Sequence, residues 1–190
     1  MLSRAVAGGG AIVAGGVFLG GLTGIATAAR SAEQDVRILN LVLLLEELET
    51  AFYADALNRG VLRGELAEFA RVVGAHEQAH VAYLRKALGD RAEARPRFDF
   101  GDTTSDPDRF AVTAAMLEDT GIAAYNGQAV NLTKPVLKAA ATIVSVEARH
   151  AAWIRDIVGR PAAPDATDDP ATEAQVRAAV GRTGFVKAGG

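Results

Sequence analysis

Two copies of the pattern Glu-x-x-His occur in this chain, as Glu77-Gln78-Ala79-His80 and Glu147-Ala148-Arg149-His150. On a helix, side chains three residues apart project from one face, so the glutamate and histidine of each copy can reach a common ion. Two such pairs on separate helices, with one glutamate from each of two further helices, form a two-metal carboxylate site in a four-helix bundle. The repeat therefore predicts four helices around a pair of metal ions.

Helix boundaries can be predicted on both sides of these two copies. Ser31 and Gln34 have the form of a capping box, and Gly60 ends the helix that begins there. Asp106 followed by Pro107 has the form of a helix N-terminus, because proline is favoured in the first turn. The sequence thus predicts an all-α fold with helices at about residues 31–58, 64–88, 107–131 and 133–158.

The lengths of the connections predict how these helices are joined. Short turns join the first helix to the second and the third to the fourth, so each pair must be antiparallel. The connection at residues 90–106 has 17 residues and spans up to about 56 Å, more than the roughly 38 Å of a 25-residue helix. We therefore expect one long crossover here, with residues 96–100 as an extended strip that lays two aromatic side chains over the bundle.

The two remaining helices supply Glu46 and Glu118 as candidate ligands. Each lies in an apolar run, where a carboxylate is costly unless a cation offsets its charge. All four glutamates fall near the midpoints of their helices, so they should meet at one height, and their four charges match two divalent ions. The predicted metal site consists of Glu46, Glu77, His80, Glu118, Glu147 and His150.

Further residues near this site have two interpretations each. Tyr53 and Tyr125 follow Glu46 and Glu118 by seven residues, two turns along the same faces, where they can hydrogen-bond near the cluster. Both are equally well explained as core aromatic residues with a satisfied hydroxyl. Glu49, one turn after Glu46, is an alternative to it as the ligand from the first helix.

The stretch from His76 to His80 also spells His-Glu-x-x-His, the helix motif of zinc metalloproteases. In that motif both histidines bind zinc and the glutamate acts as the base, with a third ligand and a peptide cleft beside the helix. The sequence has no convincing run of strands, and this hypothesis leaves Glu118 and the second Glu-x-x-His unexplained. We therefore keep it as a minor alternative and expect His76 on the helix surface or behind the ligands.

The composition limits the kinds of partner and metal site. The chain has 20 basic and 23 acidic residues and a net charge of −3, so it lacks the basic surface that nucleic-acid binding requires. The absence of cysteine excludes disulfides, thiolate metal sites and iron–sulfur clusters. Any metal must use carboxylate and imidazole ligands, which suit iron and also accept manganese or zinc.

Three regions are expected along the chain: residues 1–30, the bundle at 31–160, and a peripheral tail at 161–190 with a short helix near 172–180. Between Arg4 and Arg30 the sequence is almost wholly apolar or small, with small residues at 26–29, which predicts a secretory signal and export to the periplasm or cell envelope. The stretch is also long enough to cross a bilayer, so an uncleaved membrane anchor is the alternative. It resembles a twin-arginine signal but has only Arg4.

The stretches Leu39–Tyr53 and His76–Val81 resemble the ferritin-like superfamily, and within it the exported ferritin-like domain proteins often called desiccation-related. The resemblance covers residues 33–160, and the intervals of 31, 41 and 29 residues between the four glutamates are similar to those in bacterioferritin and rubrerythrin. It implies a ferritin-like four-helix bundle that holds two iron ions. By this resemblance Glu77 and Glu147 bridge the ions, Glu46 and His80 complete one, and Glu118 and His150 the other.

The chain departs from these relatives in two ways. Bacterioferritin has a haem-ligating methionine where this chain has Gln78, so we expect no haem. Rubrerythrins carry a cysteine-bound iron that delivers electrons, so here a peroxidase cycle would need an external electron donor. Two functions follow: oxidation of Fe(II) by dioxygen or peroxide at the metal pair, or a non-catalytic stress-related role of the bundle in the cell envelope. A homo-oligomer is compatible with either.

Overall fold

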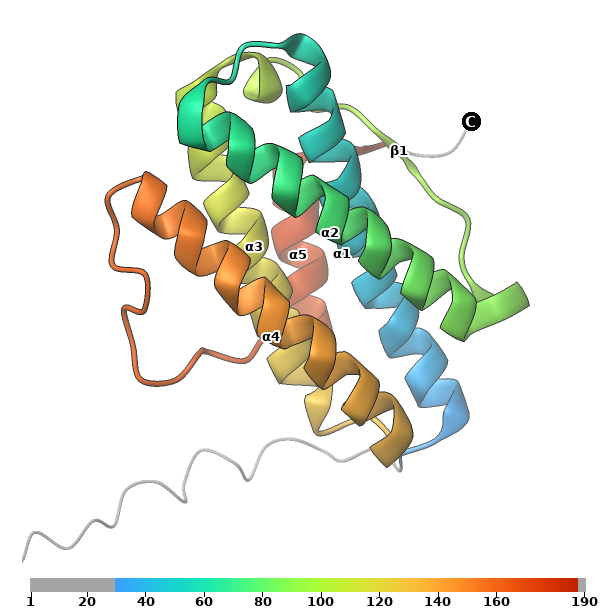
Figure 1. Ribbon diagram of the computed structural model, residues 1–190. Coiled ribbons are helices and arrows are strands. Elements are labelled where there is room, and N and C mark those ends of the chain that lie inside the picture. Colours follow the sequence, from blue (N-terminus) through green and yellow to red (C-terminus); the bar gives the residue numbers. More distant parts are fainter. Residues whose placement is uncertain (1–29, 188–190) are drawn as a thin grey trace, which may run out of the picture.

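The computed structural model describes residues 30–187, which form a bundle of four long helices with a shorter fifth helix beside it (Figure 1). This confirms the predicted all-α fold. Two-residue strands and two 3-10 turns complete the described elements. Their bounds are α1 (Ala32–Arg59), α2 (Gly64–Leu88), η1 (Gly89–Arg91), β1 (Arg97–Phe98), η2 (Thr103–Ser105), α3 (Pro107–Ala129), α4 (Lys134–Ile157), α5 (Glu173–Thr183) and β2 (Val186–Lys187).

Capping residues set the ends of α1 and α3 where the sequence predicts them. The hydroxyl of Ser31 accepts a hydrogen bond from the backbone N–H of Gln34 at 3.1 Å. Gly60 ends α1 in the left-handed conformation, with φ of 64°, which side chains other than glycine rarely adopt. At the start of α3 the carboxylate of Asp106 accepts from the backbone N–H of Arg109 at 2.9 Å.

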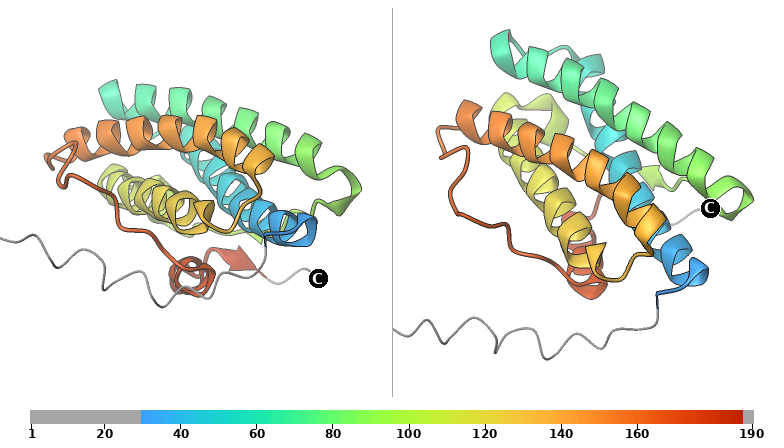
Figure 2. Two further views of the ribbon diagram at one scale, coloured as in Figure 1. Left: turned by 90° about the horizontal axis from the view of Figure 1, so that it is seen from below. Right: turned by 60° about the horizontal axis from the view of Figure 1, so that its bottom comes forward.

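One long connection determines the topology, as predicted. Short turns make α1 antiparallel to α2 and α3 antiparallel to α4, and each of these pairs packs closely. The segment between α2 and α3 runs back along the bundle before α3 begins (Figure 1). Helices α2 and α4 form one layer, α1 and α3 a second, and α5 covers the outer side of the second layer (Figure 2).

The segment after residue 161 differs from our expectation of a peripheral tail. In α5, Val176 and Val180 are buried in the main core cluster. Strand β2 pairs with β1 in antiparallel register. This pairing joins the C-terminal segment to the extended part of the crossover between α2 and α3. Gly127 on α3 lets the segment before α5 pack directly against this helix. A Cβ at Gly127 would lie 1.8 Å from the backbone oxygen of Ala171. Pairings of two residues are too short to recognise in a sequence.

The apolar core consists of two clusters toward opposite ends of the bundle. The larger cluster contains Phe52, Phe69 and Phe110, with the rings of Phe52 and Phe110 stacked at 5.0 Å between centroids. The smaller cluster gathers around Leu84 and Ile143. The midpoints of the four long helices, which carry the predicted ligands, fall between these clusters.

Among residues 30–187, no helix combines the length and the apolar run that crossing a bilayer requires. The predicted signal or anchor at residues 1–30 lies, apart from Arg30, outside the described residues.

Candidate metal centre

Each of the four long helices contributes one buried glutamate at the middle of the bundle. Glu77 and Glu118 have no exposed surface, and Glu46 and Glu147 are 1% exposed. His80 and His150 follow one turn after Glu77 and Glu147, and His150 is 3% exposed. The glutamate–histidine spacing of three places each pair on one helical face, as predicted. All six predicted side chains therefore meet in the bundle interior.

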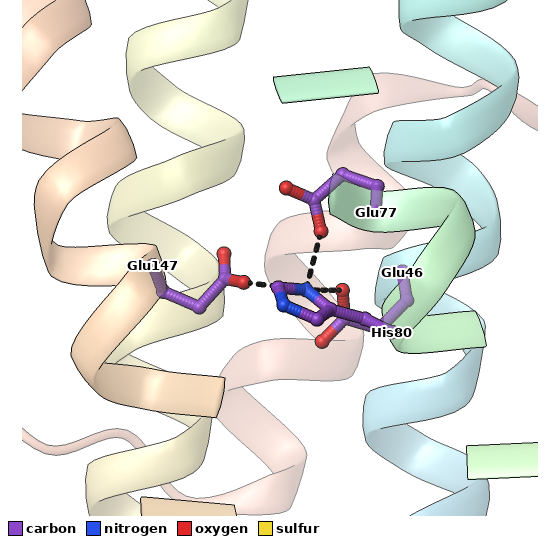
Figure 3. A group of neighbouring side chains, drawn as sticks. All are labelled: Glu46, Glu77, His80 and Glu147. Atoms are coloured by element: carbon purple, nitrogen blue, oxygen red, sulfur yellow. Dashed lines mark hydrogen bonds and ion pairs between the residues drawn. The ribbon is translucent and has the colours of Figure 1, made fainter. Parts of the chain in front are cut away.

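The imidazole of His80 faces three carboxylates (Figure 3). Its Nδ1 lies 2.9 Å from Oε1 of Glu147, 3.0 Å from Oε2 of Glu77 and 3.3 Å from Oε2 of Glu46. These carboxylates come from three different helices. The nitrogen and the three oxygens therefore enclose one small volume.

The imidazole of His150 faces a second set of three carboxylates. Its Nδ1 lies 2.9 Å from Oε1 of Glu77, 3.4 Å from Oε2 of Glu118 and 3.8 Å from Oε2 of Glu147. Glu77 and Glu147 thus each present one oxygen to His80 and the other to His150. Two carboxylates placed in this way would each be able to bridge a pair of ions.

Two groups of possible ligand atoms follow from these contacts, and within each group all atoms lie within 4.8 Å of one another. Both groups contain Glu77 and Glu147. One is completed by Glu46 and His80, which we call position 1, and the other by Glu118 and His150, which we call position 2. This geometry is the one that the resemblance implies. The role of these residues as metal ligands stays a prediction.

Several buried atoms at the centre fit a metal because they lack satisfactory hydrogen bonds. Among the described residues, both carboxylate oxygens of Glu147, Oε1 of Glu77, Oε2 of Glu118 and Nδ1 of His150 make none of acceptable geometry. Buried polar atoms without partners are rare, and buried charges require compensation. Oxygen and imidazole donors suit iron, manganese and zinc alike. The donor set therefore fits a pair of such ions.

Without cations, burial and mutual repulsion shift the pKa values of the carboxyl groups. Burial raises the pKa of Glu46 well above its usual value, and the charges of Glu147 and Glu77 raise it further. Burial also raises the pKa of Glu118, to about 8. Burial opposes ionisation of Glu77 as well, but its close contacts with the imidazoles of His150 and His80 outweigh burial and lower its pKa to about 2.

The two histidines carry protons in the metal-free site. Burial disfavours the charged imidazole of His80, but its hydrogen bonds with carboxylates outweigh burial and raise its pKa to about 12. Burial also disfavours the charged imidazole of His150, but the carboxylates close to its Nδ1 outweigh burial and raise its pKa to about 12. Any metal ion that binds here would have to displace these protons.

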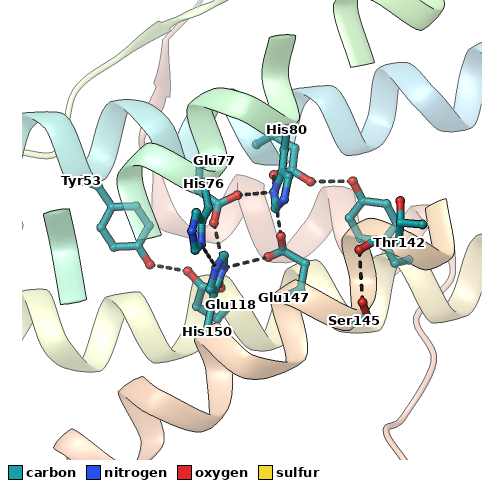
Figure 4. A network of polar contacts seen from close by, with 11 residues as sticks. Tyr53, His76, Glu77, His80, Glu118, Thr142, Ser145, Glu147 and His150 are labelled. Atoms are coloured by element: carbon teal, nitrogen blue, oxygen red, sulfur yellow. Dashed lines mark hydrogen bonds and ion pairs between the residues drawn. The ribbon is translucent and has the colours of Figure 1, made fainter. Parts of the chain in front are cut away.

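The two predicted tyrosines bond to the carboxylates in a crossed manner. Tyr53 on α1 donates a hydrogen bond to Oε1 of Glu118 on α3, as Figure 4 shows. Tyr125 on α3 donates to Oε1 of Glu46 on α1 at 2.5 Å. Both hydroxyl groups are buried, so each tyrosine is a core aromatic residue and also a partner of a candidate ligand. The two interpretations from the sequence are thus compatible.

The two residues considered as alternatives lie beside the centre. His76 is in neither group of possible ligands; its Nδ1 lies 2.8 Å from Nε2 of His150, and the two rings stack (Figure 4). This position behind His150 does not match the zinc-protease arrangement, in which the first histidine of the motif binds the ion. Glu49 is 2% exposed and also lies outside both groups.

A surface pocket opens between α2 and α4 onto the histidine side of the centre. Its volume is about 340 Å³. His76, His80 and His150 contribute to its lining, together with Arg149 and with apolar residues that include Trp153. The indole N–H of Trp153 donates to Oε1 of Glu65 at 2.9 Å, which fixes this wall. No sequence pattern indicates this pocket, because it depends on how two helices pack.

Comparison with known proteins gives one finding on the family. The model of the ferritin-like domain family matches residues 34–160, which include all six candidate ligands. A search of curated proteins found no match.

Proposed function

This chain belongs to the ferritin-like domain family, and on that premise we propose that it is a di-iron carboxylate protein of the cell envelope that oxidises Fe(II) with dioxygen or peroxide. The observation that carries the proposal is the pair of ligand groups that share Glu77 and Glu147. Each group offers three carboxylates and one imidazole. Such donors bind iron and leave coordination positions open to a small reactant.

The charges of the site match the proposed ions. Four carboxylates carry −4 when ionised and two Fe(II) ions carry +4, so the loaded site is neutral. When bound, the iron pair supplies two electrons, one from each Fe(II). With two protons these electrons reduce hydrogen peroxide to two molecules of water, or dioxygen to hydrogen peroxide. The chain has no cysteine for a second iron centre, so a cycle that returns to Fe(II) takes its electrons from an external donor.

The protein side chains hold and orient the site. Glu77 and Glu147 keep both positions at a fixed separation, because each presents one oxygen to each histidine. Tyr53 and Tyr125 fix the carboxylates of Glu118 and Glu46 through their hydroxyl groups. Such partners of ligands typically change metal affinity by about 10- to 100-fold when removed. The apolar clusters on either side exclude water from the rest of the bundle core.

Reactants reach the site through the pocket between α2 and α4. It brings solvent to His76, which is exposed, and to the edges of His80 and His150. A volume of about 340 Å³ admits dioxygen, hydrogen peroxide and hydrated Fe(II). The largely apolar lining also suits dioxygen, which is itself apolar.

Anaerobic loading with Fe(II), followed by exposure to oxygen or peroxide, tests this proposal. We expect saturation near two irons per chain and a rapid optical change on oxidation. Glu47→Gln is a matched control, because Glu47 is buried on α1 but pairs with Arg85 instead of the cluster. The control should behave as the wild type, whereas Glu77→Gln should lose stoichiometric loading. Absence of stoichiometric uptake by the wild-type protein would favour the non-catalytic role.

The location in the envelope rests on residues 1–30 alone. Fractionation of cells that express the full chain tests it, with a variant that lacks residues 2–29 as the control. We expect the full chain in the envelope or periplasmic fraction and the shortened chain in the cytoplasm. Equal distribution of the two would contradict export.

A further inference from the structure

The two metal positions are nearly related by a two-fold repeat of sequence and contact. Glu46 and Glu118 each precede a tyrosine by seven residues, and each tyrosine bonds to the other helix's glutamate. In each Glu-x-x-His copy, the histidine Nδ1 lies 2.9 Å from a carboxylate oxygen of the other copy's glutamate. Where a residue near position 1 and its counterpart near position 2 differ in type, the two metal positions differ in chemistry.

Two such differences occur next to the candidate ligands. Three residues after Glu46 stands Glu49, whereas three residues after Glu118 stands Gly121. One residue before Glu77 stands His76, whereas one residue before Glu147 stands Val146, which has no polar side-chain atom. The repeat is thus broken once by an added carboxylate and once by an added imidazole.

Both added groups lie at position 2. His76 contacts His150, the histidine of that position, at 2.8 Å between ring nitrogens. Glu49 is buried, and its Oε1 lies near Gly121 on α3 beside Oε2 of Glu147, the oxygen that faces His150. Glu49 also acts electrostatically on Tyr53, the tyrosine that bonds to Glu118. Position 2 therefore has more donor and charge capacity than position 1.

Gly121 lies opposite Glu49 and leaves a small space beside its carboxylate. A Cβ placed on Gly121 would lie 3.7 Å from Oε1 of Glu49 and 3.8 Å from Oε2 of Glu147. The two oxygens therefore border the same methyl-sized space on the face of α3. Because Glu49 lies outside the ligand group, it must move to coordinate, and this space gives it a path.

We propose that Glu49 is a fifth carboxylate donor, for the ion held by Glu118 and His150, and that this ion binds first and more tightly than the ion held by Glu46 and His80. The inference rests on the proposed two-metal site and assigns an order of loading to it. An added anionic donor lowers the free-energy cost of removing the ion from water, because a further ligand and a further negative charge replace part of its hydration shell. The neighbouring position lacks this donor.

Stepwise titration of the metal-free protein with Mn(II) tests the inference, with free Mn(II) followed by electron paramagnetic resonance. For the wild type we expect two ions per chain in two separate steps. Glu49→Gln keeps the size of the side chain but removes the anionic donor, so it should weaken the first step about 10- to 100-fold and leave two ions bound at high Mn(II). Glu47→Gln, the control, should leave both steps unchanged.

A second variant tests the same inference without removing a charge. Gly121→Ala fills the space between Glu49 and α3 at ordinary contact distances, and alanine is the better helix former, so the variant should fold. We expect a weaker first step here too. Two equal steps in the wild type, or unchanged first steps in both variants, would overturn the role of Glu49 but not the two-metal site. Failure of the wild type to bind two ions would overturn the proposed function itself.

Discussion

The charged layer at mid-height and the two apolar clusters beside it follow opposite physical rules. In the clusters, buried Phe52, Phe69 and Phe110 gain stability by leaving water and packing edge to face or stacked. In the charged layer, Glu46, Glu77, Glu118 and Glu147 are equally buried but carry groups that lose solvation. The clusters therefore stabilise the fold, whereas the layer costs stability unless cations offset its charge.

Because of this difference, we expect that mutations can affect the fold and the site separately. Changes in the layer should remove metal binding while the helices remain folded. Changes in the clusters should lower stability while the folded fraction still binds metal. The following experiments test this separation.

The largest effect is expected from removal of a bridging carboxylate. Glu77→Ala or Glu147→Ala removes one carboxylate oxygen from position 1 and one from position 2, so each variant should lose paired metal binding altogether. Metal analysis after dialysis measures the loss, and circular dichroism should show a folded helical bundle. His76→Ala should keep two ions per chain. If His76→Ala instead lost the metal, the zinc-protease hypothesis would regain support.

The converse effect is expected from the larger apolar cluster. Phe52→Ala leaves a cavity among Tyr53, Phe100 and Phe110, and should lower the free energy of unfolding by about 3–5 kcal/mol. Denaturant unfolding measures this change. The folded fraction should still bind two ions per chain. Loss of metal stoichiometry in a folded Phe52→Ala protein would show that the two regions are not separable.

Metal removal should lower the free energy of unfolding without any change in the apolar clusters, because the metal binds in the charged layer. At a free metal concentration of about 100 times the dissociation constant, binding to one site of the folded state adds about 2.7 kcal/mol to the free energy of unfolding. Thermal unfolding with Mn(II) and then with excess chelator measures the difference. The Glu77→Ala variant is the control, and its midpoint should not respond to either addition.

Metal affinity should also depend on pH. Below pH 8 the metal-free site holds protons on Glu118, with a pKa of about 8, and on His80 and His150, with pKa values of about 12. Metal must displace these protons, so affinity should rise with pH, by up to tenfold or about 1.4 kcal/mol per unit for each proton released. Titrations at pH 6 and 7 compare the affinities. Equal values would contradict protonation of the empty site.

Much of the fold could be predicted from the sequence because its signals are local. The capping residues Ser31 and Asp106 and the terminator Gly60 act within a few residues, and they set the observed ends of the helices. The pairing of β1 with β2 and the burial of Val176 and Val180 could not be predicted. These contacts join residues far apart in the chain and have no pattern of their own.

The candidate site was predictable to the level of its residues but not of its contacts. The repeated Glu-x-x-His and the mid-helix glutamates identified six side chains that the structure brings together. The crossed bonds of Tyr53 and Tyr125 required the arrangement of α1 against α3, which spacing alone does not specify. Gly121 gave no signal either, because its importance depends on Glu49 across the bundle.

Anomalous X-ray scattering from crystals loaded with Mn(II) or iron would locate the two metal ions themselves. We predict two peaks inside the bundle, one beside Nδ1 of His80 and one beside Nδ1 of His150, with oxygens of Glu77 and Glu147 between them. A single peak held by His76 and His80, or no peak among the four central glutamates, would contradict the two-metal site.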